Sequence, residues 1–247
     1  MRILVTAGNT QILIDRVRCI TNIFTGRTGT SIALEAYCRE HDVTLLTSHP
    51  EVIDDLRGPL KLDAKRWQCH TYRTFDDLDA LMTWHIAHAP QDIVIHCAAV
   101  SDYRAAGVFA PSATTHFHTD EHTWVDGNNG TPRMHDRSGG KVKSDEPELW
   151  LRLVRTPKLV DRVRRDWGYR GILVKFKLEV GVSEEELRDV AESSRQCSSA
   201  DWMVANTLEG ATEWALIGSA HGYRKVARPA LASDLMDVLE HQEAHRG

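Results

Sequence analysis

The residue types most suited to chemistry gather in one stretch near the N-terminus. Residues 15–29 read Asp-Arg-Val-Arg-Cys-Ile-Thr-Asn-Ile-Phe-Thr-Gly-Arg-Thr-Gly, between a short apolar run and an amphipathic run that begins near Gly29. A glycine-punctuated loop between a strand and a helix presents backbone N–H groups, and the helix dipole favours negative charge there. Arg16, Arg18 and Arg27 add positive charge to the same loop. The stretch therefore predicts a site for a phosphorylated ligand.

A second candidate position follows the most apolar strand of the chain. Residues 92–98 read Asp-Ile-Val-Ile-His-Cys-Ala, which is typical of a central parallel strand buried on both faces. Ala98 and Ala99 are small enough to let a ligand approach the backbone, and an ordinary place in the core is the alternative. Asp102 follows at the carboxyl edge, where ligands bind in open α/β sheets. A turn-capping role for Asp102 is equally open from the residues alone.

Histidines are frequent in one irregular segment but lack a metal-binding pattern. His116, His118, His122 and His135 match no standard zinc spacing, and no cysteine lies near them in the sequence. Solvated loop histidines explain them better than a metal site. We therefore predict no metal ligand among them.

The bulk composition narrows the function classes. The chain has 247 residues, of which 42% are hydrophobic, as expected for a globular protein with a substantial core. Its net charge of −5 argues against a nucleic-acid-binding protein. Its five cysteines are scattered without a CxxC pair, which favours a reducing compartment. Because no apolar run has the length of a signal peptide or membrane span, we expect a cytoplasmic protein with no membrane partner.

Alternating strand and helix patterns must position these residues. Strands are predicted at 2–6, 42–47, 67–72, 92–98, 148–154, 171–178, 201–205 and 213–218, and helices at 29–40, 76–89, 157–167, 183–198 and 229–242. This rhythm predicts a Rossmann-like three-layer α/β/α sandwich with a mostly parallel sheet. We expect a single domain over residues 1–247. Residues 104–140 break the rhythm and predict an irregular flap, a long loop or insertion over the site.

Two helix starts carry specific signals. Thr156 precedes Pro157, which predicts an N-cap followed by proline at the first helical position. Ser183 precedes three glutamates, which predicts a capping box with Glu186.

Six motifs, in order along nearly the whole chain, resemble one enzyme family. They occupy residues 3–10 with 15–29, 98–103 (Ala-Ala-Val-Ser-Asp-Tyr), 141–143 (Lys-Val-Lys), 156–159 (Thr-Pro-Lys-Leu), 175–179 (Lys-Phe-Lys-Leu-Glu) and 205–206 (Ala-Asn). Together they are similar to phosphopantothenate–cysteine ligase (phosphopantothenoylcysteine synthetase), within the DNA/pantothenate metabolism flavoprotein C-terminal domain family. No flavoprotein decarboxylase segment precedes the first motif, so we expect the stand-alone form.

The resemblance implies that the protein joins 4′-phosphopantothenate to L-cysteine in coenzyme A biosynthesis. The substrate carboxylate would attack the α-phosphate of a nucleoside triphosphate, and the cysteine amine would then displace the nucleotide from the acyl-nucleotide. Such a reaction depends on alignment and charge stabilisation, with little need for a covalent enzyme nucleophile. The resemblance also implies Mg²⁺, with CTP favoured over ATP as co-substrate, and a homodimer.

The same resemblance assigns roles to residues by their place in the motifs. Asn22 and Lys141 are the implied catalytic residues: Asn22 would hold the activated acyl group, and Lys141 would neutralise charge on the triphosphate. The implied substrate-binding residues are Arg18, Asn22 and Ala99. The implied nucleotide-binding residues are Gly8, Gly26, Arg27, Gly29, Ala98, Asp102, Lys141, Lys143, Thr156, Pro157, Lys158, Leu159 and Phe176. Without the resemblance, a turn role for Asn22 and a core position for Phe176 are the simpler interpretations.

The chain departs from the family pattern at several places. Asn9 stands where the family usually has glycine. The predicted helix at 183–198 lacks the lysines that fused members use near the nucleotide phosphates, and Arg195 is the only substitute we can suggest. Residues 112–139, which hold most of the irregular segment, have no counterpart.

Two other function classes stay open at this point. A nicotinamide-dependent reductase is disfavoured, because the first loop has no GxGxxG and the chain has no Tyr-x-x-x-Lys pair. A non-catalytic nucleotide-binding module is disfavoured only through the resemblance. Pyrophosphate release with phosphopantothenate and a nucleotide distinguishes the ligase from both.

Overall fold

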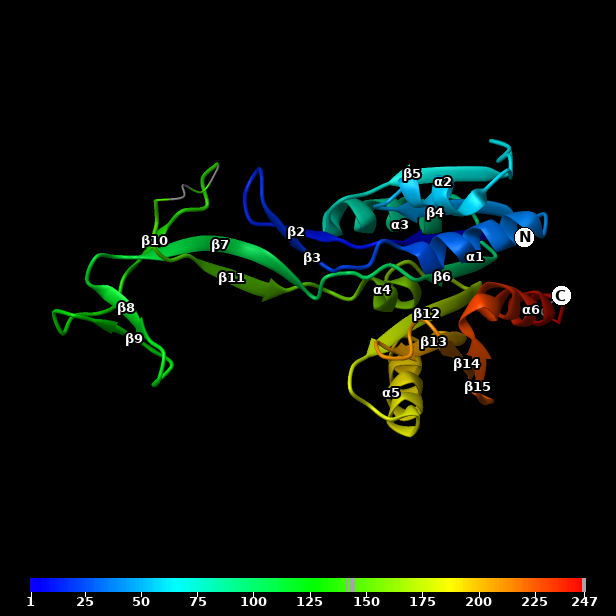
Figure 1. The fold of residues 1–247 in the computed structure, drawn as a ribbon. Helices are drawn as coiled ribbons and strands as arrows, with labels where there is room; N and C mark the ends of the chain where they lie inside the picture. Colours follow the sequence, from blue (N-terminus) through cyan, green and yellow to red (C-terminus); the bar gives the residue numbers. More distant parts are fainter. Residues whose placement is uncertain (141, 143–144, 246–247) are drawn as a thin grey trace. The chain divides into compact units, whose positions relative to one another are not determined.

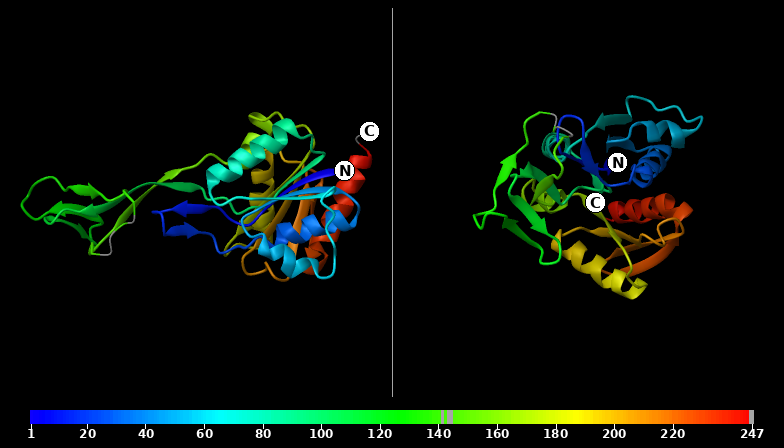
Figure 2. Two further views of the ribbon diagram at one scale, coloured as in Figure 1. Left: turned by 90° about the horizontal axis from the view of Figure 1, so that it is seen from above. Right: turned by 60° about the vertical axis from the view of Figure 1, so that its left-hand side comes forward.

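The computed structural model describes residues 1–140, 142 and 145–245. The chain divides into two compact units. The first unit contains Met1–Thr10, Ile23–Val100 and the chain from Lys158 onward, and the second contains Gln11–Asn22 and Ser101–Pro157. Figures 1 and 2 show the ribbon of the chain, coloured along the sequence.

A mostly parallel sheet forms the centre of the first unit. Eight strands of the described chain lie in the order β15-β14-β13-β12-β6-β1-β4-β5. Their bounds are β1 Arg2–Ala7, β4 Asp42–Thr47, β5 Trp67–Thr71, β6 Ile93–His96, β12 Ile172–Glu179, β13 Trp202–Thr207, β14 Trp214–Ser219 and β15 Gly222–Ala227. The strands from β5 to β13 pair in parallel, and β14 and β15 pair antiparallel. The predicted Rossmann-like fold class is confirmed, and β6 is a central strand as its apolar run indicated.

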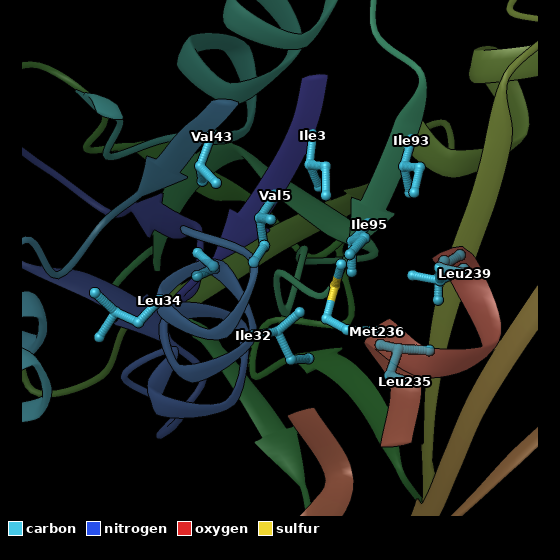
Figure 3. Packing of buried hydrophobic residues seen from close by; sticks show 14 of the residues in the cluster. Ile3, Val5, Ile32, Leu34, Val43, Ile93, Ile95, Leu235, Met236 and Leu239 are labelled. Carbon is cyan, nitrogen blue, oxygen red and sulfur yellow. The ribbon is translucent and has the colours of Figure 1, made fainter. Parts of the chain in front are cut away.

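Helices cover both faces of this sheet. Their bounds are α1 Arg27–Cys38, α2 Glu51–Arg57, α3 Phe75–His88, α4 Leu159–Arg165, α5 Glu184–Cys197 and α6 Leu231–Ala244. Because side chains alternate along a strand, Ile3 and Val5 pack with α1 and α6, whereas Leu4 packs with α3 and α4 on the other face. Figure 3 shows the first of these clusters. Each fully buried aliphatic side chain contributes about 1.5–3 kcal/mol, so the two faces together hold the three layers.

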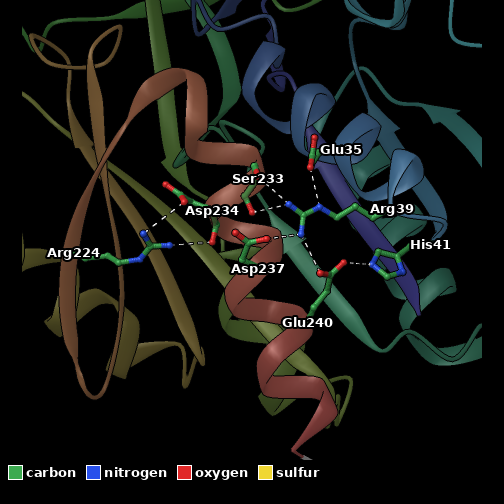
Figure 4. Close-up of polar contacts among 8 residues, drawn as sticks. All are labelled: Glu35, Arg39, His41, Arg224, Ser233, Asp234, Asp237 and Glu240. Carbon is green, nitrogen blue, oxygen red and sulfur yellow. Dashed lines mark hydrogen bonds and ion pairs between the residues drawn. The ribbon is translucent and has the colours of Figure 1, made fainter.

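An ionic cluster joins the end of α1 to α6 (Figure 4). The Arg39 guanidinium lies 2.6 Å from Asp237 and 3.0 Å from Glu240 on α6, and 2.8 Å from Glu35 on α1. His41 lies 2.8 Å from Glu240. These contacts and the apolar packing beneath them fix α6 alongside α1.

The second unit is made of antiparallel strands. Its strands are β2 Gln11–Leu13, β3 Cys19–Thr21, β7 Tyr103–Pro111, β8 Thr115–His118, β9 Thr123–Asp126, β10 Met134–Asp136 and β11 Trp150–Arg155. β7 pairs with both β10 and β11, β2 pairs with β3, and β8 pairs with β9. The prediction that residues 104–140 are irregular was therefore wrong. Phe117, Trp124 and Trp150 pack their rings at centroid distances of 4.6–5.2 Å, and they form an aromatic cluster that local composition does not reveal.

The two predicted helix starts differ in outcome. Ser183 and Glu186 form the predicted capping box at the start of α5. The Thr156 cap was wrong: the Thr156 hydroxyl donates to the Ser101 carbonyl at 2.7 Å, and α4 begins at Leu159 with Lys158 at its N-cap. α2, β15 and the β2–β3 hairpin were not predicted from the sequence. None of the described helices is long and apolar enough to cross a membrane.

Candidate functional site

A cavity of about 360 Å³ opens at the carboxyl ends of the central strands of the first unit. It is lined by Gly8 after β1, residues 23–28 around the start of α1, residues 97–99 after β6, residues 176–178 in β12, and by Asn206, Ala211 and Arg228. β1 connects through α1 to β4 on one side, whereas β6 leads to β12 on the other side. The cavity therefore lies at the point where the strand order reverses, which is where open α/β sheets bind ligands.

Glycines allow the start of α1 to approach the end of β1. Gly8 and Gly26 have φ angles of +91° and +82°, which residues other than glycine rarely adopt. A Cβ atom at Gly26 would lie 2.8 Å from the Gly8 Cα and 2.9 Å from the Ala7 carbonyl carbon. Gly29 in α1 lies against Ala7 in the same way, with a Cβ placed 2.8 Å from the Ala7 Cβ. The close backbone approach thus shapes one wall of the cavity.

Backbone hydrogen bonds hold the floor of the cavity beyond the ends of the strands. The Ala99 N–H donates to the Gly8 carbonyl at 2.8 Å, and the Asn9 side-chain amide donates to the Phe24 carbonyl at 2.9 Å. The Ala98 N–H donates to the Thr6 hydroxyl at 3.1 Å. Asn9 therefore connects the end of β1 to the segment that leads into α1, a structural role at the position where the family usually has glycine.

The charged residues that line the cavity are all cations. Arg27, Lys177 and Arg228 contribute to the lining, and within the described residues no aspartate or glutamate does. The backbone N–H groups of the first turn of α1 add a positive dipole end. The arrangement favours an anionic ligand, as the sequence predicted for this loop.

The cysteine and histidine at this strand end are electrically neutral near pH 7. Burial raises the pKa of the Cys97 thiol to about 12, so the thiolate is not available as a nucleophile. Burial also lowers the pKa of His96 to about 4, and its Nδ1 lies 3.0 Å from the Thr6 hydroxyl. Among the residues the structure describes, no three His, Cys, Asp or Glu side chains gather to hold a metal ion. The site therefore offers charge stabilisation and backbone donors.

Six of the predicted nucleotide- and substrate-binding residues line the cavity. They are Gly8, Gly26, Arg27, Ala98, Ala99 and Phe176. Leu159 is a core residue, 1% exposed, packed with Leu4 and Leu173. Lys158 is exposed beside it at the N-cap of α4. Neither of these two residues lines the cavity.

Five further predicted site residues belong to the second unit: Arg18, Asn22, Asp102, Thr156 and Pro157. There Arg18 lies 2.8 Å from Asp15 and donates to the Val142 carbonyl at 2.8 Å. The Arg18 guanidinium holds the pKa of the Asp15 carboxyl far below its usual range. Asn22 directly follows β3 and is the last residue of the Gln11–Asn22 segment, and Asp102 directly precedes β7.

Thr156 contacts Asp102 in that unit. The Thr156 N–H donates to the Asp102 carbonyl at 2.9 Å, and Pro157 ends the second unit. Lys141 and Lys143 lie outside the described residues.

Four cavity residues that carry a cation or a hydroxyl were not among the predicted site residues: Thr25, Thr28, Lys177 and Arg228. The Arg228 side chain reaches Thr28 in the first turn of α1 and donates a hydrogen bond to its hydroxyl. No local signal marks Arg228, because it lies in a short turn 200 residues from Thr28. Arg195, suggested as a substitute for the missing lysines, instead binds Glu192 at 2.7 Å and the Ala200 carbonyl at 2.7 Å. It lines a separate cavity near α6.

The comparisons with known proteins agree with this geometry. Residues 1–111 match the model of the DNA/pantothenate metabolism flavoprotein C-terminal domain family. Over 245 residues the chain is 30% identical to the coenzyme A biosynthesis bifunctional protein CoaBC of Thermococcus kodakarensis, a match that covers 97% of this chain and 51% of the relative. The family resemblance is confirmed. The CoaBC protein of Escherichia coli is 28% identical over 216 residues, which are 86% of this chain and 42% of that protein. The chain thus spans about half the length of the curated relatives it matches.

Solved structures match across the whole chain. The DNA/pantothenate metabolism flavoprotein of Streptococcus pneumoniae has a TM-score of 0.75 at 25% identity, and the match covers 98% of this chain and 99% of that one. A Cab2 variant in complex with phosphopantothenate-cysteine has a TM-score of 0.69 at 16% identity, covering 99% and 88% of the two chains. The second likeness shows the fold alone.

Proposed function

We propose that this chain is a phosphopantothenate–cysteine ligase of coenzyme A biosynthesis. The observation that carries the proposal is the 30% identity to a coenzyme A biosynthesis protein, which extends over 97% of this chain. The family model that matches is a C-terminal domain, so the proposed activity is that of the C-terminal half of the bifunctional relatives. The Cab2 structure of the same fold holds phosphopantothenate-cysteine, the product proposed here.

The cavity in the first unit suits the nucleotide of this reaction. In the proposed reaction a carboxylate oxygen of 4′-phosphopantothenate attacks the α-phosphorus of the triphosphate, and pyrophosphate leaves. The cysteine amine then attacks the acyl carbon, and the nucleoside monophosphate leaves. Three cations and the first turn of α1 supply fixed positive charge for the phosphates. Within this proposal Asn22 holds the acyl group, Lys141 offsets charge on the triphosphate, and Arg18 binds the pantothenate substrate.

CTP is the proposed nucleotide and Mg²⁺ the proposed cofactor. The lining of the cavity includes no carboxylate within the described residues, and Mg²⁺ often keeps several waters while bound mainly by substrate phosphates. The lining residues of the cavity therefore fit a Mg²⁺ ion that is bound by the triphosphate oxygens and water. The metal would supply charge neutralisation at the phosphate oxygens.

A homodimer is part of the same proposal. In the described chain, exposed large hydrophobic side chains are frequent in the second unit: Leu13, Val17, Ile20, Tyr103, Met134, Leu149 and Leu153. Where such side chains form a contiguous patch, they mark an association surface. Sedimentation at assay concentration tests the proposal, and a fully active monomer would contradict it. A cytoplasmic location stays a prediction.

The deciding experiment follows pyrophosphate and the acyl-nucleotide. The purified chain is mixed with 4′-phosphopantothenate, Mg²⁺ and either CTP or ATP, without cysteine. We expect pyrophosphate and an acyl-nucleotide to form together, faster with CTP, and cysteine to convert the adduct to the amide. If neither nucleotide yields the adduct or the amide, the proposed function is wrong.

An asparagine variant sharpens the same experiment. Asn22→Ala should still bind nucleotide but lose most turnover, because a neutral carboxamide donor to the acyl group is removed. Asn128→Ala, in the turn after β9 of the same unit, is the matched control and should keep wild-type turnover. Wild-type turnover in Asn22→Ala would remove Asn22 from the reaction.

A further inference from the structure

Arg228 differs from the other two cations of the cavity because it has no carboxylate partner among the described residues. Arg27 lies 3.2 Å from Asp55, and Lys177 lies 2.8 Å from Glu179. Within the described residues Arg228 forms no ion pair, and its guanidinium donates to the uncharged hydroxyl of Thr28. The cavity therefore contains a half-buried guanidinium whose charge the protein itself leaves unbalanced.

Both ends of Arg228 are fixed. Its backbone N–H donates to the Glu213 carbonyl at 2.8 Å, and it lies in the turn that connects β15 to α6. At the other end the guanidinium is bonded to Thr28, the second residue of α1. These two hydrogen bonds hold the guanidinium charge of Arg228 in place at the start of α1.

That location is unfavourable for a cation on its own. The start of α1 carries the positive end of the helix dipole, so a guanidinium placed there is repelled. Partial burial also removes water from the guanidinium without supplying a counter-ion. An anion in the cavity relieves both costs, because it interacts with Arg228 and with the helix N–H groups together.

We propose that Arg228 binds the triphosphate of the nucleotide at the start of α1. The proposal rests on the proposed ligase function. A guanidinium has five N–H donors in a planar fork, and one bond to Thr28 leaves others for phosphate oxygens. Arg228 is thus a nucleotide-binding residue contributed by the turn before α6, and it adds to those that the family motifs imply.

The test compares Arg228→Gln with Arg224→Gln by calorimetric binding. Arg224 is the matched control: it lies on β15 four residues earlier, 3.7 Å from Asp234, and does not line the cavity. The probes are CTP, inorganic pyrophosphate and 4′-phosphopantothenate. Loss of a charge-assisted hydrogen bond predicts that Arg228→Gln weakens CTP and pyrophosphate binding about tenfold to hundredfold. We expect phosphopantothenate binding to stay unchanged, and Arg224→Gln to bind all three like the wild type.

Two outcomes would overturn the proposal. Wild-type affinity of Arg228→Gln for CTP and pyrophosphate would remove Arg228 from the triphosphate site, even if the wild type forms the acyl-nucleotide. A loss confined to phosphopantothenate would assign Arg228 to the phosphate of the other substrate. If Arg228→Gln does not fold, Arg228→Lys is measured in its place, and it should bind pyrophosphate more weakly than the wild type because an ammonium has no planar fork.

Discussion

Replacing Gly26 by alanine tests the close approach that shapes the cavity. A methyl group at Gly26 would lie 2.8 Å from the Gly8 Cα and 2.9 Å from the Ala7 carbonyl carbon, and it would also overlap the Gly8 amide nitrogen. These atoms all belong to the backbone, so a change of side-chain rotamer cannot relieve the overlap. The end of β1 and the start of α1 would have to separate.

Two costs add in this variant. Gly26 has a φ of +82°, and the left-handed conformation costs an alanine about 1–2 kcal/mol. Forcing packed atoms apart costs typically about 1–3 kcal/mol more. Gly181 is the matched control, because its φ is +68° and nothing lies within 4 Å of a Cβ there. Gly181→Ala should therefore show only the first cost.

Urea unfolding of both variants measures the difference. We expect Gly26→Ala to lose about 2–5 kcal/mol of unfolding free energy and Gly181→Ala about 1–2 kcal/mol. Gly26→Ala should also bind CTP more weakly, since the wall of the cavity moves, whereas Gly181→Ala should bind it normally. Equal stability losses in the two variants would refute the close approach as the reason for glycine at position 26.

Two further predictions concern stability. Burial lowers the pKa of His96 to about 4 from an unfolded value near 6.5, so its contribution is fully present above pH 6.5 and is lost as the pH falls toward 4. The wild type should lose about 2 kcal/mol more unfolding free energy between pH 7.5 and pH 5 than His96→Gln does. Equal losses in the two proteins would show that folding does not change the pKa of His96. Arg39→Met should cost about 1–2 kcal/mol in urea unfolding at low salt, because three carboxylates then lack their common cation. Arg57→Met, which breaks one exposed pair, should cost less than about 0.5 kcal/mol, and equal costs would contradict a cooperative cluster.

The parallel sheet could be predicted because its central strands are buried on both faces. Residues 92–98 form a nearly continuous apolar run, and such a run is stable only in the middle of a covered sheet. The strands of the second unit lack this signal. In β7 only Val108 and Ala110 are buried, the first half of the strand is exposed or half-buried, and the strand contains Gly107. Its pairing with β10 and β11 therefore depends on distant partners. That is why the segment from 104 to 140 read as irregular.

The site divides along the same line between local and distant determinants. Gly8 and Gly26 could be predicted, because the backbone geometry of a turn depends on the residues of the turn itself. Arg228 could not be, because its place in the cavity depends on α6 lying beside α1. That packing follows from apolar side chains on both helices and from the ion pairs of Arg39 with Asp237. The apolar side chains of α1 and α6 recur at helical spacing in the sequence, and this spacing predicts which face of each helix is buried. It does not predict where the turn before α6 lies. A cation in such a turn enters the site only once two helices far apart in the chain have packed together, so only the folded structure identifies it.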